Sequence, residues 1–138
     1  MSIGILGYGV YLPLYRVKKE EIGKAWDTGG RGELVVPGPD EDVITMLTEA
    51  AGNALKQAGV AGSDVDAIYL ASNSTPYLEH SSISVIADVF QCSPELETAE
   101  FAHTTGAAIA AWKAASDAVA SGRKKHVLVL ASDFRPAG

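Results

Sequence analysis

The stretch AEFAHTTGAAIAAWKAA, residues 99 to 115, joins a β-type run to a helix through a short polar turn. The run at 96–102 predicts a strand, and the alanine-rich residues after the turn predict a closely packed helix. Some enzymes mount a nucleophilic cysteine or serine at such a strand-to-helix break. In this chain the residue at the break is His103. The stretch therefore predicts an α/β fold and raises the question of what a histidine does at this position.

Strands and helices alternate along the rest of the chain as well. Short apolar runs predict buried strands, and apolar residues at helical spacing predict the helices between them. The stretch 27–42 is rich in Gly and Pro and predicts a loop. The expected strands are 3–10, 66–72, 96–102 and 124–133, and the expected helices are 20–26, 40–58, 83–90 and 104–120.

Residue types that favour helix caps mark several of these ends. Ser81 or Ser82 is expected to cap the third helix, and Thr104 or Thr105 the fourth. Gly122 is expected to end the fourth helix because glycine adopts the left-handed conformation at low cost.

The order strand–helix–strand predicts a mostly parallel sheet with helices on both faces. In such sheets the functional crevice lies beyond the carboxyl ends of the strands. Three segments are expected to collect there: the turn after Val10, the loop at 72–77, and the turn at His103.

Composition narrows the classes of function. The chain has 138 residues and a formal net charge of −6, which argues against a basic nucleic-acid-binding face. No apolar run reaches the roughly 20 residues that span a bilayer, and the first residues do not read as a signal peptide. Cys92 is the single cysteine, and the three histidines are widely spaced, so no metal site is expected. We therefore expect a cytoplasmic protein without nucleic-acid or membrane partners.

Five segments together resemble a known family. They are GILGYGVYLPLYRV (4–17), PGPDEDVITMLTEAAGNALKQAG (37–59), AIYLASNSTPY (67–77), AEFAHTTGAAIAA (99–111) and HVLVLASDFRP (126–136). In this order they resemble the N-terminal half of the thiolase superfamily, in the branch of 3-hydroxy-3-methylglutaryl-CoA synthase, which is similar to ketoacyl-ACP synthase III. The resemblance implies a single thiolase-like N-terminal domain over 1–138, incomplete relative to the family. It also implies a context of acyl transfer and condensation of coenzyme A thioesters.

The chain departs from the family at the two positions that carry chemistry in this half. The resemblance places the acyl-accepting cysteine at His103, and it places the acid/base glutamate of an S-E-S-x-P-Y loop at Asn73. The family's catalytic histidine belongs to the second half. The resemblance therefore implies a chain that does not work as a cysteine-dependent synthase by itself.

Each substituted residue leaves alternatives open. His103 can be a polar residue without chemistry, a hydrogen-bonding or proton-transferring group, or a covalent catalyst. The dipole of the following helix disfavours a charged imidazole there. Asn73 has no useful proton to exchange, so it either orients a thioester carbonyl or satisfies its own loop. Cys92 lies in a separate polar turn and is expected to be a bystander.

The segment KKEEIGKAWDTGGRGE (18–33) resembles the family region near the pantetheine tunnel and the coenzyme A phosphates. Trp26 is a candidate stacking partner for adenine. The candidate phosphate ligands are Lys18, Lys19, Lys24 and Arg31. The alternative is a solvated helix face with alternating charges. Gly106 is expected where a Cβ would crowd the turn or the pocket. The ligand implied is a coenzyme A thioester that is not covalently held.

Three kinds of function fit these observations. The chain is a subunit or half of an acyl-CoA condensing enzyme, a non-catalytic thiolase-like scaffold, or a fragment of a longer synthase. The first predicts exposed apolar surface covered by a thiolase-like or accessory subunit. The second predicts a dimer, which in the family pairs through the strand before the nucleophile, here 96–102.

Overall fold

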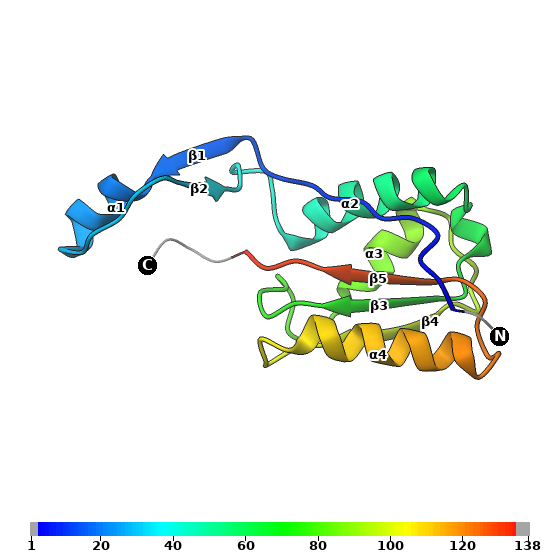
Figure 1. Ribbon diagram of the computed structural model, residues 1–138. Helices are drawn as coiled ribbons and strands as arrows, with labels where there is room; N and C mark the ends of the chain where they lie inside the picture. Colours follow the sequence, from blue (N-terminus) through cyan, green and yellow to red (C-terminus); the bar gives the residue numbers. More distant parts are fainter. Residues whose placement is uncertain (1–2, 135–138) are drawn as a thin grey trace.

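A parallel three-stranded sheet forms the centre of the computed structural model, which describes residues 3–134. The strand order is β4 (Glu97–Phe101), β3 (Ala67–Ala71), β5 (Val127–Ala131), with Ala67 opposite both Glu97 and Val127. β3 is buried at every residue because strands cover both of its sides and helices cover both of its faces (Figure 1). The predicted parallel sheet is confirmed.

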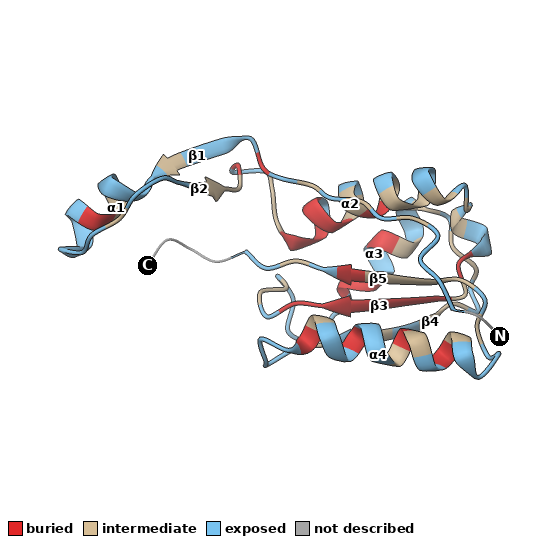
Figure 2. Ribbon diagram, in the orientation of Figure 1, coloured by how far each residue is buried: buried red, intermediate tan, exposed pale blue. Residues whose placement is uncertain are grey.

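Two helices cover one face of the sheet, and one helix covers the other. α2 (Val43–Ala58) and α3 (Ser82–Val89) pack on one face around Leu47, Ile68 and Ile83. α4 (Ala107–Ala120) covers the other face with alanines, which allow close approach to Tyr69. The buried residues lie along β3 and at intervals along the helices that pack on the sheet (Figure 2).

The helix ends agree with the sequence in part. Asp42 caps α2 through a reciprocal bond with Thr45, and Gly59 ends it at φ 66°. Ser81 stands at the N-cap of α3, but its hydroxyl does not cap the helix; it donates instead to Glu100, which also accepts from the backbone N–H of Ser82. The expectation of a serine cap is therefore wrong, because a carboxylate from β4 takes that role.

Residues 3–10 do not form the buried strand that their apolar pattern predicts. This segment is extended and largely exposed, and Ile5 is 68% and Tyr8 71% exposed. The segment is not paired with the sheet β4-β3-β5 and lies along α2 instead, where the backbone N–H of Tyr8 donates to the Gln57 side chain (Figure 1). Gly9 makes this possible, since a Cβ there would overlap the carbonyl oxygen of Ala50.

A hairpin arm extends away from the sheet (Figure 1). β1 (Tyr15–Lys18) pairs antiparallel with β2 (Glu33–Val36), and α1 (Lys19–Trp26) lies between them. The helix agrees with the expectation for 20–26. The expectation of a continuous loop over 27–42 is wrong at β2, which is a strand because it pairs with β1. Its four residues are too few to show the alternation of apolar and polar residues that predicts a strand. A 3₁₀ turn, η1 (Gly62–Asp64), precedes β3.

Candidate functional site

His103 and Asn73 lie on one groove at the carboxyl ends of β3 and β4. The groove has a volume of about 810 Å³ and is lined by residues 72–81 in part, by β4, and by the turn at 102–105. The sequence places these two residues 30 positions apart, and the parallel pairing of β3 with β4 brings their loops together. The segment after Val10 does not join this groove; it lines a separate cleft.

His103 has a left-handed backbone conformation. Its φ is 64°, which is uncommon for a residue with a side chain, and the residue is exposed. α4 begins after its N-cap Gly106, so the imidazole precedes the helix by a bend rather than capping it. Thr104 forms a turn before the helix: its hydroxyl accepts from Gly106 N at 3.2 Å, and its carbonyl accepts from Ala107 N at 3.2 Å. The expected cap by Thr104 or Thr105 is wrong, because the N-cap of α4 is Gly106 and no side chain caps the helix.

Asn73 is held by both its backbone and its side chain. Its backbone N–H donates to Asp133 Oδ1 at 2.6 Å, and its side-chain amide donates to the carbonyl of Thr104 at 3.2 Å. The residue therefore satisfies loop geometry and lines the groove at the same time.

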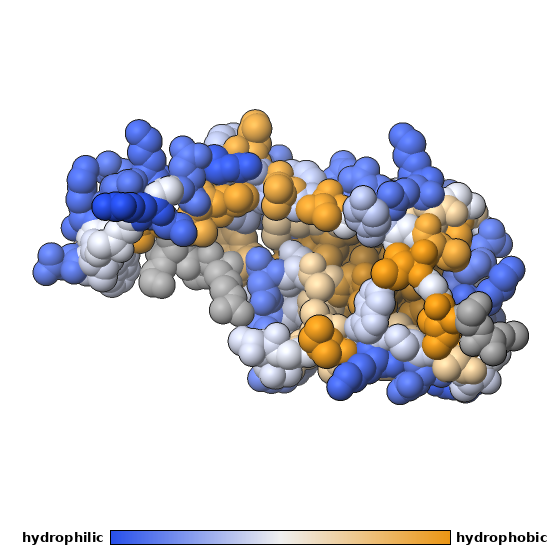
Figure 3. Space-filling view, viewed as in Figure 1, coloured by the Kyte–Doolittle hydropathy of each residue, from blue (hydrophilic) through white to orange (hydrophobic). Residues whose placement is uncertain are grey.

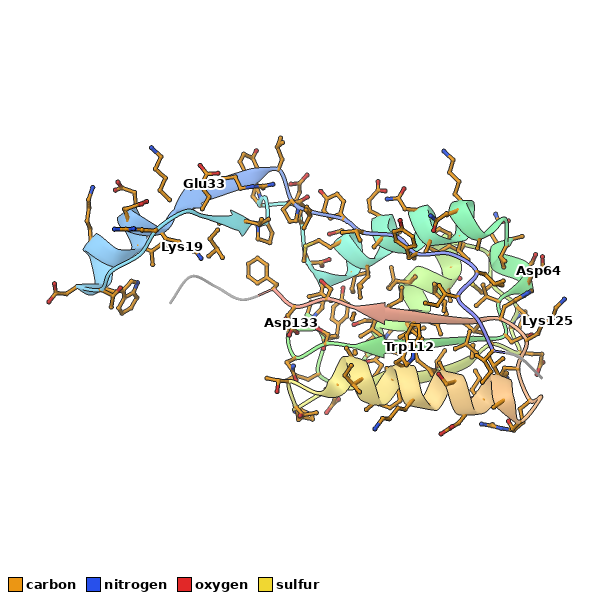
Figure 4. The ribbon with its side chains drawn as sticks, viewed as in Figure 1. Lys19, Glu33, Asp64, Trp112, Lys125 and Asp133 are labelled. Carbon is orange, nitrogen blue, oxygen red and sulfur yellow. The ribbon has the colours of Figure 1, made fainter. Side chains whose placement is uncertain are left out.

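Two acidic residues of the site escape prediction from the sequence. Asp133 follows β5 and accepts hydrogen bonds from Ser72, Asn73 and Ser74 (Figure 4). Glu100 on β4 lines the groove, and its carboxylate accepts hydrogen bonds from the Ser81 hydroxyl and the Ser82 backbone N–H at the start of α3. Asp133 carries a weak signal, since an acid directly after an apolar strand points to the functional edge of a parallel sheet. Glu100 carries none.

A second cleft, of about 910 Å³, lies between the arm and the end of β5. Trp26 lines it, 63% exposed, with Leu12, Ile22 and Phe134 among its apolar neighbours. The lining residues in the described part of the chain include Trp26 but not Lys24 or Arg31. The Lys24 ammonium instead pairs with Glu21 at 3.0 Å on the exposed face of α1. Of the basic candidates, Lys19 lines the cleft with Trp26, whereas Lys24 and Arg31 are not among its described lining residues.

Gly106 does not have the role expected of it. A Cβ at this position would lie 3.7 Å from the Thr104 hydroxyl oxygen, an ordinary van der Waals distance. Its φ of −86° is open to any residue. The expected crowding is wrong because, apart from the residue's own chain neighbours, no atom lies closer to that Cβ position than the Thr104 hydroxyl oxygen.

Titratable groups near the two hollows have shifted pKa values with clear causes. The Tyr11 hydroxyl at the rim of the second cleft donates to Glu41, which raises the pKa of Tyr11. The backbone N–H of Gly38 lowers the pKa of Glu41. Burial raises the pKa of the Cys92 thiol, which disfavours the nucleophilic thiolate. Within residues 3–134 no group of His, Cys, Asp and Glu is arranged to hold a metal ion, and no helix could cross a membrane.

Sequence comparison finds relatives named hydroxymethylglutaryl-CoA synthase. The chain is 43% identical over 134 residues to a hydroxymethylglutaryl-CoA synthase of Pyrococcus horikoshii, covering 96% of this chain and 38% of that protein. It is 40% identical to the synthase of Methanosphaera stadtmanae, covering 94% of this chain and 40% of that one. The chain thus spans about two fifths of the length of these relatives. No family model matches.

Solved structures share the fold. The priming β-ketosynthase of a polyketide biosynthetic pathway superposes with a TM-score of 0.83 at 25% identity, over 94% of this chain and 41% of that one. The chain is thiolase-like. 3-Oxoacyl-[acyl-carrier-protein] synthase III of Aquifex aeolicus gives a TM-score of 0.82 at 24% identity, over 94% of this chain and 44% of that one. These matches agree with the N-terminal half of a thiolase-like protein, as the sequence predicted.

Proposed function

We propose that this thiolase-like chain is one half of an acyl-CoA condensing enzyme, completed by a second thiolase-like or accessory polypeptide segment. The observation that carries the proposal is an apolar face on residues 3–14. Ile5, Leu6, Tyr8 and Val10 are each more than 60% exposed, and Leu14 is 83% exposed. Figure 3 shows hydrophobic residues gathered on this side of the molecule. A continuous apolar stretch of this kind favours a protein partner over water.

The backbone of the same segment supports a partner as well. The extended residues 3–10 belong to no strand, and β4 and β5 are the edges of the described sheet. Extended apolar segments and open strand edges are sites where another chain adds hydrogen bonds and buried area. A completing polypeptide segment supplies both.

The groove at His103 favours binding over covalent chemistry. An amide at Asn73 exchanges no proton near neutral pH, and one of its N–H groups already donates to Thr104. Acyl-imidazoles hydrolyse readily, so His103 is a poor lasting acyl carrier. We propose that the groove orients a thioester through hydrogen bonds, and that Trp26 in the neighbouring cleft contacts the coenzyme A moiety.

Mass spectrometry tests the chemistry directly. The isolated chain incubated with acetyl-CoA is expected to show no acyl adduct, and His103→Cys alone is expected to restore no condensation. The chain purified with its genomic neighbours is then assayed for condensation. A stable adduct on the isolated wild-type chain would contradict the proposal, as would full activity of that chain without a partner.

A non-catalytic scaffold is the second candidate, and the open edge of β4 favours it. In this alternative the thiolase-like chain is a cytoplasmic pseudoenzyme that forms a homodimer or stabilises an active relative through that edge. The two candidates differ in activity: a complex that assembles but does not condense acyl groups supports the scaffold.

A further inference from the structure

A chain of hydrogen bonds crosses the carboxyl edge of the sheet from β5 to β4. It starts at Asp133, directly after β5, whose Oδ1 accepts from the backbone N–H of Asn73 at 2.6 Å. The same oxygen accepts from the hydroxyls of Ser72 at 3.3 Å and Ser74 at 3.4 Å. Ser74 in turn accepts from the backbone N–H of Phe134 at 2.7 Å. These bonds tie the loop after β3 to the end of β5 from both directions.

The side chain of Asn73 carries the connection onward to β4. Its amide donates to the carbonyl of Thr104, the residue after His103. Thr104 also accepts from Gly106 N through its hydroxyl and from Ala107 N through its carbonyl, in the turn before α4. Asp133 therefore connects with the turn at 103–106 through Asn73, and none of the hydrogen bonds described above joins Asp133 directly to that turn.

The turn needs such support because His103 is left-handed. A residue with a side chain in this conformation carries a backbone cost and persists where its surroundings determine it. His103 is exposed, so packing does not supply the restraint. The side-chain amide of Asn73 supplies the restraint by donating to the carbonyl of Thr104. A carboxylate at the same position would repel that carbonyl oxygen.

We propose that Asp133 and Asn73 are positioning residues that hold the turn of His103. The amide at position 73 is then a structural requirement of this turn. This inference goes beyond the proposed function, because it concerns the shape of the groove and needs neither a partner nor turnover.

Backbone and side-chain NMR of the intact chain tests whether Asn73 holds the turn of His103. Asn73→Asp keeps the size of the side chain but removes the donor, and Asn53→Asp is the matched control on the exposed face of α2. We expect Asn73→Asp to move the amide signals of 103–106 and the imidazole signals of His103, and the control to leave them in place. Unchanged signals at 103–106 in Asn73→Asp would overturn the proposal.

Asp133 variants test whether the effect is relayed. In Asp133→Ala the Asn73 side-chain amide is expected to approach the shifts of a free asparagine, and the signals of 103–106 to move in the same sense as in Asn73→Asp. Exchange of the Asn73 backbone N–H is expected to rise at least about tenfold, since a hydrogen bond to a charged acceptor is lost. Asp133→Asn keeps an acceptor oxygen and is expected to restore part of each change.

The amide signals of β3 report whether the fold survives in every variant. If Asp133→Ala does not fold, the same signals are measured in Asp133→Asn and Ser74→Ala, where smaller changes in the same direction are expected. Signals of 103–106 that stay unmoved while the Asn73 backbone N–H loses protection would refute the relay from Asp133 to His103. That result would leave the proposed condensing function untouched.

Discussion

Proline at position 98 tests whether the open edge of β4 pairs with another strand. Glu97 N donates to the Asp66 carbonyl and Ser72 N donates to the Phe101 carbonyl, both at 3.1 Å. Along a strand, successive N–H groups point to alternate sides, so the N–H of Thr98 points away from β3 toward the open edge. Thr98→Pro therefore removes no bond within the chain but blocks an added strand.

The expected size of the effect follows from the number of bonds lost. A symmetric pair of β4 strands loses one hydrogen bond per chain, each with a net contribution of about 0.5–1.5 kcal/mol. The sum of about 1–3 kcal/mol weakens the dimer roughly 5- to 150-fold. Sedimentation equilibrium over a range of concentrations measures this change.

Ala99→Pro is the matched control for the same strand. The N–H of Ala99 points toward β3, so its loss leaves a carbonyl of the fully buried β3 without a donor and destabilises the fold by about 1–3 kcal/mol. Thr98→Pro is expected to lower the melting temperature far less. Equal destabilisation by the two prolines, or a dimer that Thr98→Pro leaves intact, would refute the reasoning.

Three further predictions concern the fold. Gly9→Ala is expected to release residues 3–14 from α2 and to speed limited proteolysis there, because the added Cβ overlaps the carbonyl oxygen of Ala50. Gly4→Ala is the control, since a Cβ at Gly4 meets nothing within 4 Å. Equal cleavage of the two variants would contradict the packing of this segment on α2. Ile68→Ala, at a fully buried position, is expected to lower the free energy of unfolding, measured in urea, by about 2–5 kcal/mol. Val85→Ala, at a position that is 39% exposed, is expected to lower it far less. A small loss for Ile68→Ala would place the core elsewhere. The backbone N–H groups of His126 and Lys125 lower the pKa of Asp66 below its ordinary value. Its contribution to stability is therefore present above that ordinary pKa and is lost as the pH falls through the lower folded value. Denaturation followed from pH 6 downward should therefore show a smaller acid loss in Asp66→Asn than in the control Asp88→Asn, and equal profiles would argue against this role.

Much of the fold can be read from the sequence because periodicity and caps act locally. β3 is a continuous apolar run, and α2 begins at Asp42 and ends at Gly59 as its pattern predicts. Residues 3–10 show the limit of this reasoning. Their apolar pattern is that of a strand, but pairing depends on contacts between segments far apart in the sequence, and this segment lies along α2 without joining the sheet.

The candidate site was predictable in place but not in its contacts. The rule that loops gather beyond the carboxyl ends of parallel strands places Asn73 and His103 on one groove. Asp133 and Glu100 were not foreseen, because a side chain that crosses between strands leaves no periodic signal. The grouping of Trp26 with Lys24 and Arg31 came from the family resemblance. In the structure Trp26 lines the second cleft, while Lys24 pairs with Glu21 on the exposed face of α1.

Native mass spectrometry of the chain co-expressed with its genomic neighbours, with and without coenzyme A, tests the central claim most directly. The account predicts a complex with a second, thiolase-like or accessory polypeptide, in which residues 3–14 become protected from proteolysis. A homodimer or monomer alone, with no coenzyme A bound and residues 3–14 still exposed, would contradict it.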